Sequence, residues 1–228
     1  METPSTIKLA AFDWNGTLLA DTQAAMDAEN QVRMVYGYPA VTLKQFREWF
    51  TVPIRDYWTN SGLDPAVFDR DEAKIKHLFH DAYEARIRRV RSRAGAKQIL
   101  HWLQQQGVET MIFSNHIVEE IRKQISRLSL ASELDVILAN SERTQTGASR
   151  SKGAKLATFL SERGLKPEEV MVVGDTNEEV EIAQDLGAIA VALTGGWEST
   201  TRLKASRPNY VIGHLSGLEA IVRSRNSA

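Results

Sequence analysis

Six short apolar runs divide the chain, and most are of a length typical of buried strands. They occupy residues 7–12, 108–113, 134–139, 170–174, 188–193 and, more weakly, 209–212. Several lack the alternation of apolar and polar residues that a half-exposed strand shows, which indicates a sheet covered on both faces. Segments with helical periodicity lie between them, at 96–107, 116–130 and 152–164. The sequence therefore predicts an α/β fold with a doubly wound, Rossmann-like parallel sheet.

A different pattern occupies residues 21–93, where every apolar repeat has the period of a helix. No run in this region is typical of a strand. We therefore predict that residues 21–93 form an inserted all-helical cap, and that residues 1–20 and 94–228 form the α/β core. Because both ends of the insertion adjoin the loop after the first predicted strand, the cap would be joined to the core near that loop.

Charge and composition narrow the classes of partner. The chain has 28 Lys and Arg against 29 Asp and Glu, a balance that argues against nucleic acid or an anionic membrane as partner. The basic run at 85–93 is typical of a solvated helix end that complements the helix dipole. The absence of cysteine excludes disulfides, thiolate metal sites and a cysteine nucleophile. No stretch is apolar enough for a membrane span or a signal sequence, so we expect a cytoplasmic protein.

Polar side chains follow three of the predicted strands, at the sheet edge where open parallel sheets bind ligands. They are Asp13 and Asn15 after the first strand, Ser114, Asn115 and His116 after the second, and Asp175 and Glu179 after the fourth. Lys152, in the helical segment before the fourth strand, can reach the same edge. The sequence therefore predicts one polar cleft built from residues far apart along the chain.

Each of these groups also fits a purely structural interpretation. Asn15-Gly16 is a strong hairpin-turn signal, and Thr176 with Glu179 matches a capping box. Ser114 could cap the helix after it, and Lys152 alone would be a solvated helix-end lysine. These interpretations leave unexplained why carboxylates, a hydroxyl and a lysine all fall at one edge of the sheet.

Four motifs in chain order resemble those of the haloacid dehalogenase-like hydrolases. Asp13-Trp14-Asn15-Gly16-Thr17 is similar to the family's D-x-D-G-T, with Asn15 in place of the second aspartate. “MIFSN” resembles the second motif, and “SKGAK” offers Lys152, or less favourably Lys155, as the third. “GDTNEEVEIA” resembles the fourth, with Glu179 as its last carboxylate. “LKPEEVMVVGD” and “GGWESTTRLKASRPNYVI” look like the phosphoglycolate phosphatase branch.

The resemblance implies a phosphatase that acts on a small phosphorylated metabolite, as a monomer or homodimer without nucleic acid or membrane partners. Asp13 would be the nucleophile that forms an aspartyl-phosphate, with Asn15 and Lys152 as the other catalytic residues. Mg²⁺ would be the cofactor, bound by Asp13, the Asn15 main-chain carbonyl, Asp175 and Glu179. The phosphate group would be bound by Gly16, Ser114, Asn115, His116 and Lys152.

Asn15 is the main departure from the family pattern. The usual aspartate protonates the leaving group and then activates water, and an amide can do neither. The substrate could have a leaving group that needs little protonation, or His116 could serve as the acid. Alternatively, the protein could be a phosphonate hydrolase, for which no cap lysine is identified, or a weakened phosphate-ligand sensor. The dehalogenase branch fits poorly, because Asp175 and Glu179 suggest a metal site.

The cap is expected to carry substrate specificity, as lids do in other enzymes. Arg55, Tyr57 and Trp58 are candidates for contact with the substrate, although aromatic residues at helical spacing are also typical of a core.

Overall fold

The computed structural model describes residues 6–141 and 151–226. Its centre is a six-stranded sheet in the order β3-β2-β1-β4-β5-β6, in which every pairing is parallel. The strands are β1 (Leu9–Phe12), β2 (Glu109–Ile117), β3 (Val136–Asn140), β4 (Val170–Gly174), β5 (Ile189–Leu193) and β6 (Tyr210–Ile212). The predicted α/β fold with a parallel sheet is confirmed.

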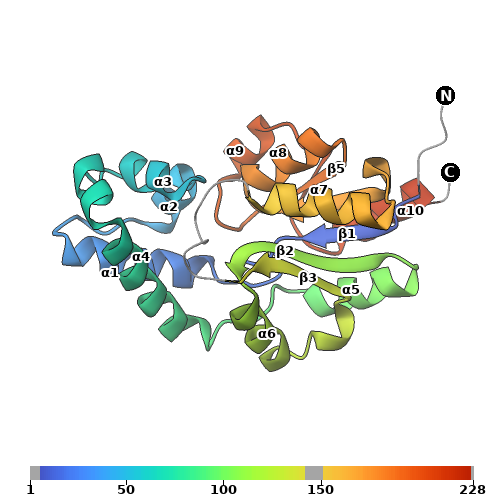
Figure 1. Cartoon of the computed structure of the whole chain (residues 1–228), viewed down its shortest axis with the longest axis horizontal. Coiled ribbons are helices and arrows are strands. Elements are labelled where there is room, and N and C mark those ends of the chain that lie inside the picture. The colour runs from blue at the N-terminus through green and yellow to red at the C-terminus, as the bar shows by residue number, and fades with distance from the viewer. Residues whose placement is uncertain (1–5, 142–150, 227–228) are drawn as a thin grey trace.

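Helices cover both faces of the sheet, as the apolar strands require (Figure 1). The helices of the core are α5 (Ala96–Gln105), α6 (Val118–Arg127), α7 (Ser151–Arg163), α8 (Asn177–Leu186), α9 (Thr200–Ala205) and α10 (Gly217–Asn226). Short 3₁₀ turns at Ala131–Glu133 and Pro167–Glu169 precede β3 and β4. Alternate β1 residues serve opposite layers, since Ala10 and Phe12 pack with α5, α6 and α10 while Leu9 and Ala11 pack with α7, α8 and α9.

Four further helices lie between β1 and α5 in the chain and form a group beside the sheet (Figure 1). They are α1 (Thr22–Val35), α2 (Leu43–Trp49), α3 (Ile54–Asn60) and α4 (Pro65–Ile87). No strand lies among residues 22–87, all of which the structure describes. This is the arrangement expected of a helical insertion, and the exact domain boundaries stay a prediction.

The starts of these helices follow from local sequence. Thr42 and Gln45 form a reciprocal capping box at α2. Pro65 occupies the first turn of α4, and the Asp64 side chain accepts a hydrogen bond from the Ala66 N–H at 2.8 Å. None of the helices in the described segments is long and apolar enough to cross a membrane.

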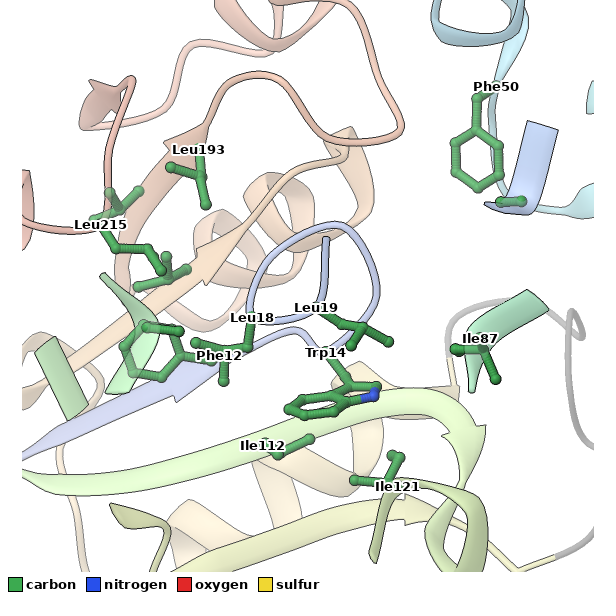
Figure 2. Close-up of a cluster of buried hydrophobic side chains, with 14 of the residues drawn as sticks. Phe12, Trp14, Leu18, Leu19, Phe50, Ile87, Ile112, Ile121, Leu193 and Leu215 are labelled. Atoms are coloured by element: carbon green, nitrogen blue, oxygen red, sulfur yellow. The ribbon is translucent and has the colours of Figure 1, made fainter. Parts of the chain in front are cut away.

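The two connections between the helical insertion and the sheet are paired with each other. The Ala20 N–H donates to the Arg91 carbonyl at 3.0 Å, and the Arg93 N–H donates to the Leu18 carbonyl at 2.8 Å. A buried cluster continues across this junction, from Phe12 of β1 through Leu18 and Trp14 of the following loop to Ile87 of α4 (Figure 2). The insertion is therefore anchored directly behind the loop that follows β1.

Two expectations about local structure were wrong. β2 continues to Ile117 instead of ending at Phe113, so α6 begins at Val118 and Ser114 is not its N-cap. The register with β3 shifts between Phe113 and Ile117, and the Asn140 amide bonds the Asn115 carbonyl at 2.7 Å, which keeps this segment extended.

Candidate active site

The loop after β1 brings Asp13 to a cavity between the sheet edge and the helical insertion. The Asp13 N–H donates to the Val173 carbonyl of β4 at 2.9 Å, and the side chain is only 6% exposed. The cavity has a volume of about 180 Å³. The core residues around it are Asp13, Asn15, Ser114, Asn115, His116, Lys152, Thr176, Glu178, Glu179 and Trp197. The structure thus brings together most of the predicted site residues, whose roles stay predictions.

Gly16 and Asp175 do not line the cavity but pack against each other, beside lining residues such as Trp197. The Asp175 carboxylate accepts hydrogen bonds from Thr17 Oγ1 at 2.5 Å and from the Trp197 N–H at 2.6 Å. Gly16 has φ +77°, and a Cβ on it would overlap the Asp175 carboxylate, so this position requires glycine. The Gly16 N–H donates to Asp21 at 2.6 Å and is therefore not directed at the cavity in this conformation.

Lys152 is the buried cation of the site. Its Nζ lies 3.3 Å from Asp13 Oδ1 and 3.0 Å from Glu178 Oε2, and it also pairs with Glu179 Oε1. Burial alone would lower the pKa of this ammonium, but the surrounding carboxylates raise it well above its usual value. Lys155 bonds Asn140 Oδ1 at 2.6 Å instead, so Lys152 is the lysine that faces the predicted nucleophile.

The carboxylates of the site outnumber its cations among the described residues. Burial raises the pKa of Asp13 well above its usual value, although Lys152 opposes the shift. Burial and the neighbouring Glu179 raise the pKa of Asp175 to about 7. The carboxylate and carbonyl oxygens gathered here are donors of the kind that Mg²⁺ prefers.

A preformed metal cluster is nevertheless absent from the part of the chain that the structure describes, since no three His, Cys, Asp or Glu side chains are grouped to hold an ion. Thr17 and Trp197 occupy the Asp175 oxygens, and Glu179 forms the capping box that the sequence indicated. Its Oε2 accepts from the Thr176 N–H at 3.0 Å and from Thr176 Oγ1 at 2.6 Å. Glu179 therefore has a structural role as well as its contact with Lys152.

Sequence reasoning missed Asp21, which is fully buried at the start of α1. Its carboxylate accepts hydrogen bonds from the Asn15 amide at 2.8 Å, the Trp197 indole at 3.0 Å and the Tyr83 hydroxyl, in addition to Gly16. Burial raises its pKa, and the bond from Tyr83 is the largest opposing effect. A lone carboxylate at the end of the apolar segment “LLAD” was the signal that could have revealed it.

Glu178 was also missed, because only Glu179 falls at the motif position. Besides Lys152, it accepts hydrogen bonds from the Asn115 amide at 3.0 and 3.2 Å. The Asn115 side chain is thus held by a carboxylate, while the prediction that its backbone N–H binds phosphate stays a prediction. Glu178 links the strand that carries Asn115 to the helix that carries Glu179.

His116 lies where the cavity meets α4. Its Nε2 is 3.7 Å from Glu84 Oε1 and 3.5 Å from Gln124 Nε2, and its ring packs edge-on against Tyr83. The His116 N–H donates to Ser114 Oγ at 3.2 Å. These contacts place the imidazole beside the cavity between the core and the insertion.

The candidates in the insertion divide into two groups. Tyr57 and Trp58 line the cavity. Arg55 does not line it. Its guanidinium forms a bidentate ion pair with Asp69, at 2.6 and 2.7 Å, on the exposed surface. Contact between Arg55 and a substrate in this cavity is therefore not supported.

The basic run at 85–93 is only partly a solvated helix end. α4 ends at Ile87, and Arg93 lies in the returning connection, where its guanidinium donates to the Gly16 carbonyl and, at 2.6 Å, to the Thr194 carbonyl. Burial is the main cause that lowers the pKa of Arg93. The expectation of a solvated face was wrong for Arg93, whose hydrogen bonds join two loops of the site.

Known proteins resemble the chain over nearly its whole length. It is 26% identical over 223 residues to the phosphoglycolate phosphatase of Pseudomonas putida, covering 94% of this chain and 80% of the relative. The phosphoglycolate phosphatase of Vibrio vulnificus is 24% identical over 234 residues, covering 96% and 98%. A haloacid dehalogenase-like family hydrolase from Streptococcus pneumoniae shares the fold, with a TM-score of 0.79 at 18% identity and coverage of 94% and 98%.

The match to a family model carries the assignment. Residues 10–193, which include Asp13, Ser114, Lys152 and Asp175, fit the model of the haloacid dehalogenase-like hydrolases. These residues come from the same segments that the fold assembles around one sheet edge. The chain therefore belongs to the haloacid dehalogenase-like hydrolase family.

Proposed function

We propose that this hydrolase is a Mg²⁺-dependent phosphatase that transfers the phosphoryl group of a small phosphorylated metabolite to Asp13. The observation that carries the proposal is the position of Asp13, a buried carboxylate at the end of β1 whose Oδ1 lies 3.3 Å from Lys152 Nζ in a cavity. The names of the Pseudomonas putida and Vibrio vulnificus relatives support phosphate-ester hydrolysis as the reaction class.

Each residue then has a defined task. A carboxylate oxygen of Asp13 attacks phosphorus, and water releases phosphate from the aspartyl-phosphate in a second step. Lys152 orients Asp13 and offsets negative charge, while Ser114 and Asn115 donate hydrogen bonds to phosphoryl oxygens. Mg²⁺, held by Asp13, the Asn15 carbonyl, Asp175 and Glu179, would supply the charge that these crowded carboxylates lack.

A phosphate-ligand sensor is the second candidate, and Asn15 is the observation that favours it. The amide donates to Asp21 and to Tyr83, at 2.8 and 2.6 Å, and cannot transfer a proton to a leaving group.

The phosphonate-hydrolase alternative requires a cap lysine. Lys76 of α4 lines the cavity, but its ammonium pairs with Glu72 at 2.8 Å.

A panel of phosphate esters assayed with Mg²⁺ tests the proposal. We expect turnover that EDTA suppresses and that Asp13→Asn abolishes, because an amide at this position cannot act as the nucleophile. Asp185→Asn, an exposed position on α8, is the matched control and should retain wild-type rates.

Robust hydrolysis by Asp13→Asn would exclude the aspartyl-phosphate route. Binding of inorganic phosphate, measured by calorimetry, without hydrolysis of any ester would favour the sensor. Circular dichroism of both variants checks that lost activity does not reflect lost folding.

A further inference from the structure

The wall of the cavity that the helical insertion supplies is dominated by aromatic and aliphatic side chains. Its apolar members and tyrosines are Phe46, Phe50, Val52, Ile54, Tyr57, Trp58, Ile75, Phe79 and Tyr83. Among the described residues of this wall, Lys76 and His80 are the basic exceptions, and Lys76 already pairs with Glu72. A small substrate with a carboxylate would find few cationic partners here.

The rings form a continuous surface that reaches the core. Phe46 and Phe50 stack with centroids 5.7 Å apart, and Phe50 meets Trp197 edge-on at 4.9 Å. Trp197 follows β5, so the aromatic surface spans both parts of the molecule. Stacked and edge-to-face geometries are the arrangements in which aromatic rings attract one another.

A second group of rings begins beside the predicted site of chemistry. The Asn15 amide donates to the Tyr83 hydroxyl at 2.6 Å, and the Tyr83 ring stacks on Phe79 at 5.8 Å with an interplanar angle of 9°. In the proposed reaction, Asn15 stands where the family's aspartate meets the leaving group. Phe79 of the wall is therefore connected through Tyr83 to Asn15, on the side of Asp13 where the leaving group would lie.

We propose that the substrate is the phosphate monoester of an aromatic hydroxyl compound. The inference rests on the proposed phosphatase function and names its substrate class. Two independent features agree on it: the wall favours an apolar ring, and Asn15 suits a leaving group that departs without a proton. Burial of the ring would supply binding free energy that a carboxylated substrate could not gain from these side chains.

The chemical step balances without a further reactant. A carboxylate oxygen of Asp13 forms a bond to phosphorus while the bond from phosphorus to the aryl oxygen breaks. The electron pair leaves with that oxygen as a phenolate, which takes a proton from solvent after release. Water then attacks the phosphorus of the aspartyl-phosphate, which returns Asp13 as a carboxylate and gives inorganic phosphate.

Four substrates separate ring binding from leaving-group reactivity: 2-naphthyl phosphate, phenyl phosphate, acetyl phosphate and 2-phosphoglycolate. The two aryl esters have similar leaving groups and differ by one fused ring, so a difference between them reports binding. We expect kcat/KM for the naphthyl ester to exceed that for the phenyl ester by about tenfold, mainly through KM. For 2-phosphoglycolate we expect kcat/KM to be about a hundredfold below that for the naphthyl ester.

Phe79→Ala probes the wall, with Tyr36→Leu as the matched loss of an aromatic ring outside the cavity. Phe79 is only partly buried, which limits the effect of its removal on folding. We expect Phe79→Ala to lower the ratio of naphthyl to acetyl phosphate kcat/KM by about tenfold, the scale of a lost hydrophobic contact. Tyr36→Leu should leave that ratio unchanged.

Turnover of acetyl phosphate with no preference for the larger ring, or a preference for 2-phosphoglycolate, would overturn the aromatic substrate class and leave the phosphatase function intact. Absence of turnover with all four substrates would instead remove the phosphatase function and, with it, this inference. The comparison of wild-type substrates decides the question even if a variant fails to fold.

Discussion

At the scale of single residues, Asn15 decides how the loop after β1 can be used. Its amide bridges Asp21 and Tyr83 and so connects the start of α1 with α4 through the loop after β1. A carboxylate at this position would lie against the Asp21 carboxylate, 2.8 Å from the present nitrogen, and the two charges would repel. The amide therefore suits the hydrogen-bond network even though it removes a proton-transfer group.

We expect Asn15→Asp to raise kcat/KM on alkyl phosphates by about tenfold, below the usual 10²–10⁴ of a positioned acid because Asp21 repels the new carboxylate. Aryl phosphates should change little, since their leaving groups need no proton. Steady-state kinetics on matched alkyl and aryl esters measures the difference, and Asn15→Ala, which removes the amide without adding an acid, is the control. A uniform loss on both classes would show that proton transfer at this position is not what limits the enzyme.

At the scale of elements, the two connections around residues 18–20 and 91–93 determine how the helical insertion meets the sheet. Main-chain hydrogen bonds pair these connections, and Arg93 adds side-chain bonds to the Gly16 and Thr194 carbonyls. One side chain thus ties the end of the insertion to the loops after β1 and β5. Arg93 therefore contacts the same loop that carries Asp13.

We expect Arg93→Ala to lower the free energy of unfolding by about 1–3 kcal/mol, because two carbonyls that are now partly buried lose a charged donor. Activity should fall as well, since the Gly16 carbonyl belongs to the loop that carries Asp13. Arg91→Ala, an exposed neighbour in the same connection, should change stability by no more than about 0.5 kcal/mol. Urea denaturation of the two variants makes the comparison, and equal losses would contradict the assigned role.

At the scale of the whole molecule, the formal net charge is close to zero, yet several ionisable side chains are buried in the interior. Glu29 of α1 is fully buried, 3.4 Å from Arg33, and its Oε2 has no hydrogen-bond partner among the described residues. Burial raises the pKa of Glu29 to about 8, and Arg33 opposes the shift. Folding therefore favours the protonated carboxyl, and the associated stability declines as the pH rises from the unfolded pKa near 4.5 through the folded value.

We expect Glu29→Gln to flatten this decline, because an amide does not ionise. The variant should gain on the order of 2 kcal/mol relative to wild type between pH 5 and pH 8. Thermal unfolding across that range measures the gain, with the exposed Glu119→Gln of α6 as control. If wild type and Glu29→Gln have parallel pH profiles, the Glu29 carboxyl is already ionised in the folded protein.

Local sequence alone determined the sheet and the loops at its edge. Residues 170–174 and 209–212 are recognisable as strands because short apolar runs bounded by turn residues can be identified without knowledge of their neighbours in space. The carboxyl ends of parallel strands share one edge, so the order of strands and polar residues along the chain is enough to place Asp13, Ser114 and Asp175 together. The extension of β2 was missed because it depends on pairing with β3.

The tertiary structure decided the connections across the site. Asp21 bonds Tyr83 and Trp197, which lie 62 and 176 residues away, and no spacing in the sequence encodes partners at such separations. The same holds for Arg93 on Thr194 and for the aromatic wall, whose rings have the helical spacing of an ordinary core. Periodicity reports which side of an element is apolar, whereas packing determines whether that side faces a core or a cavity.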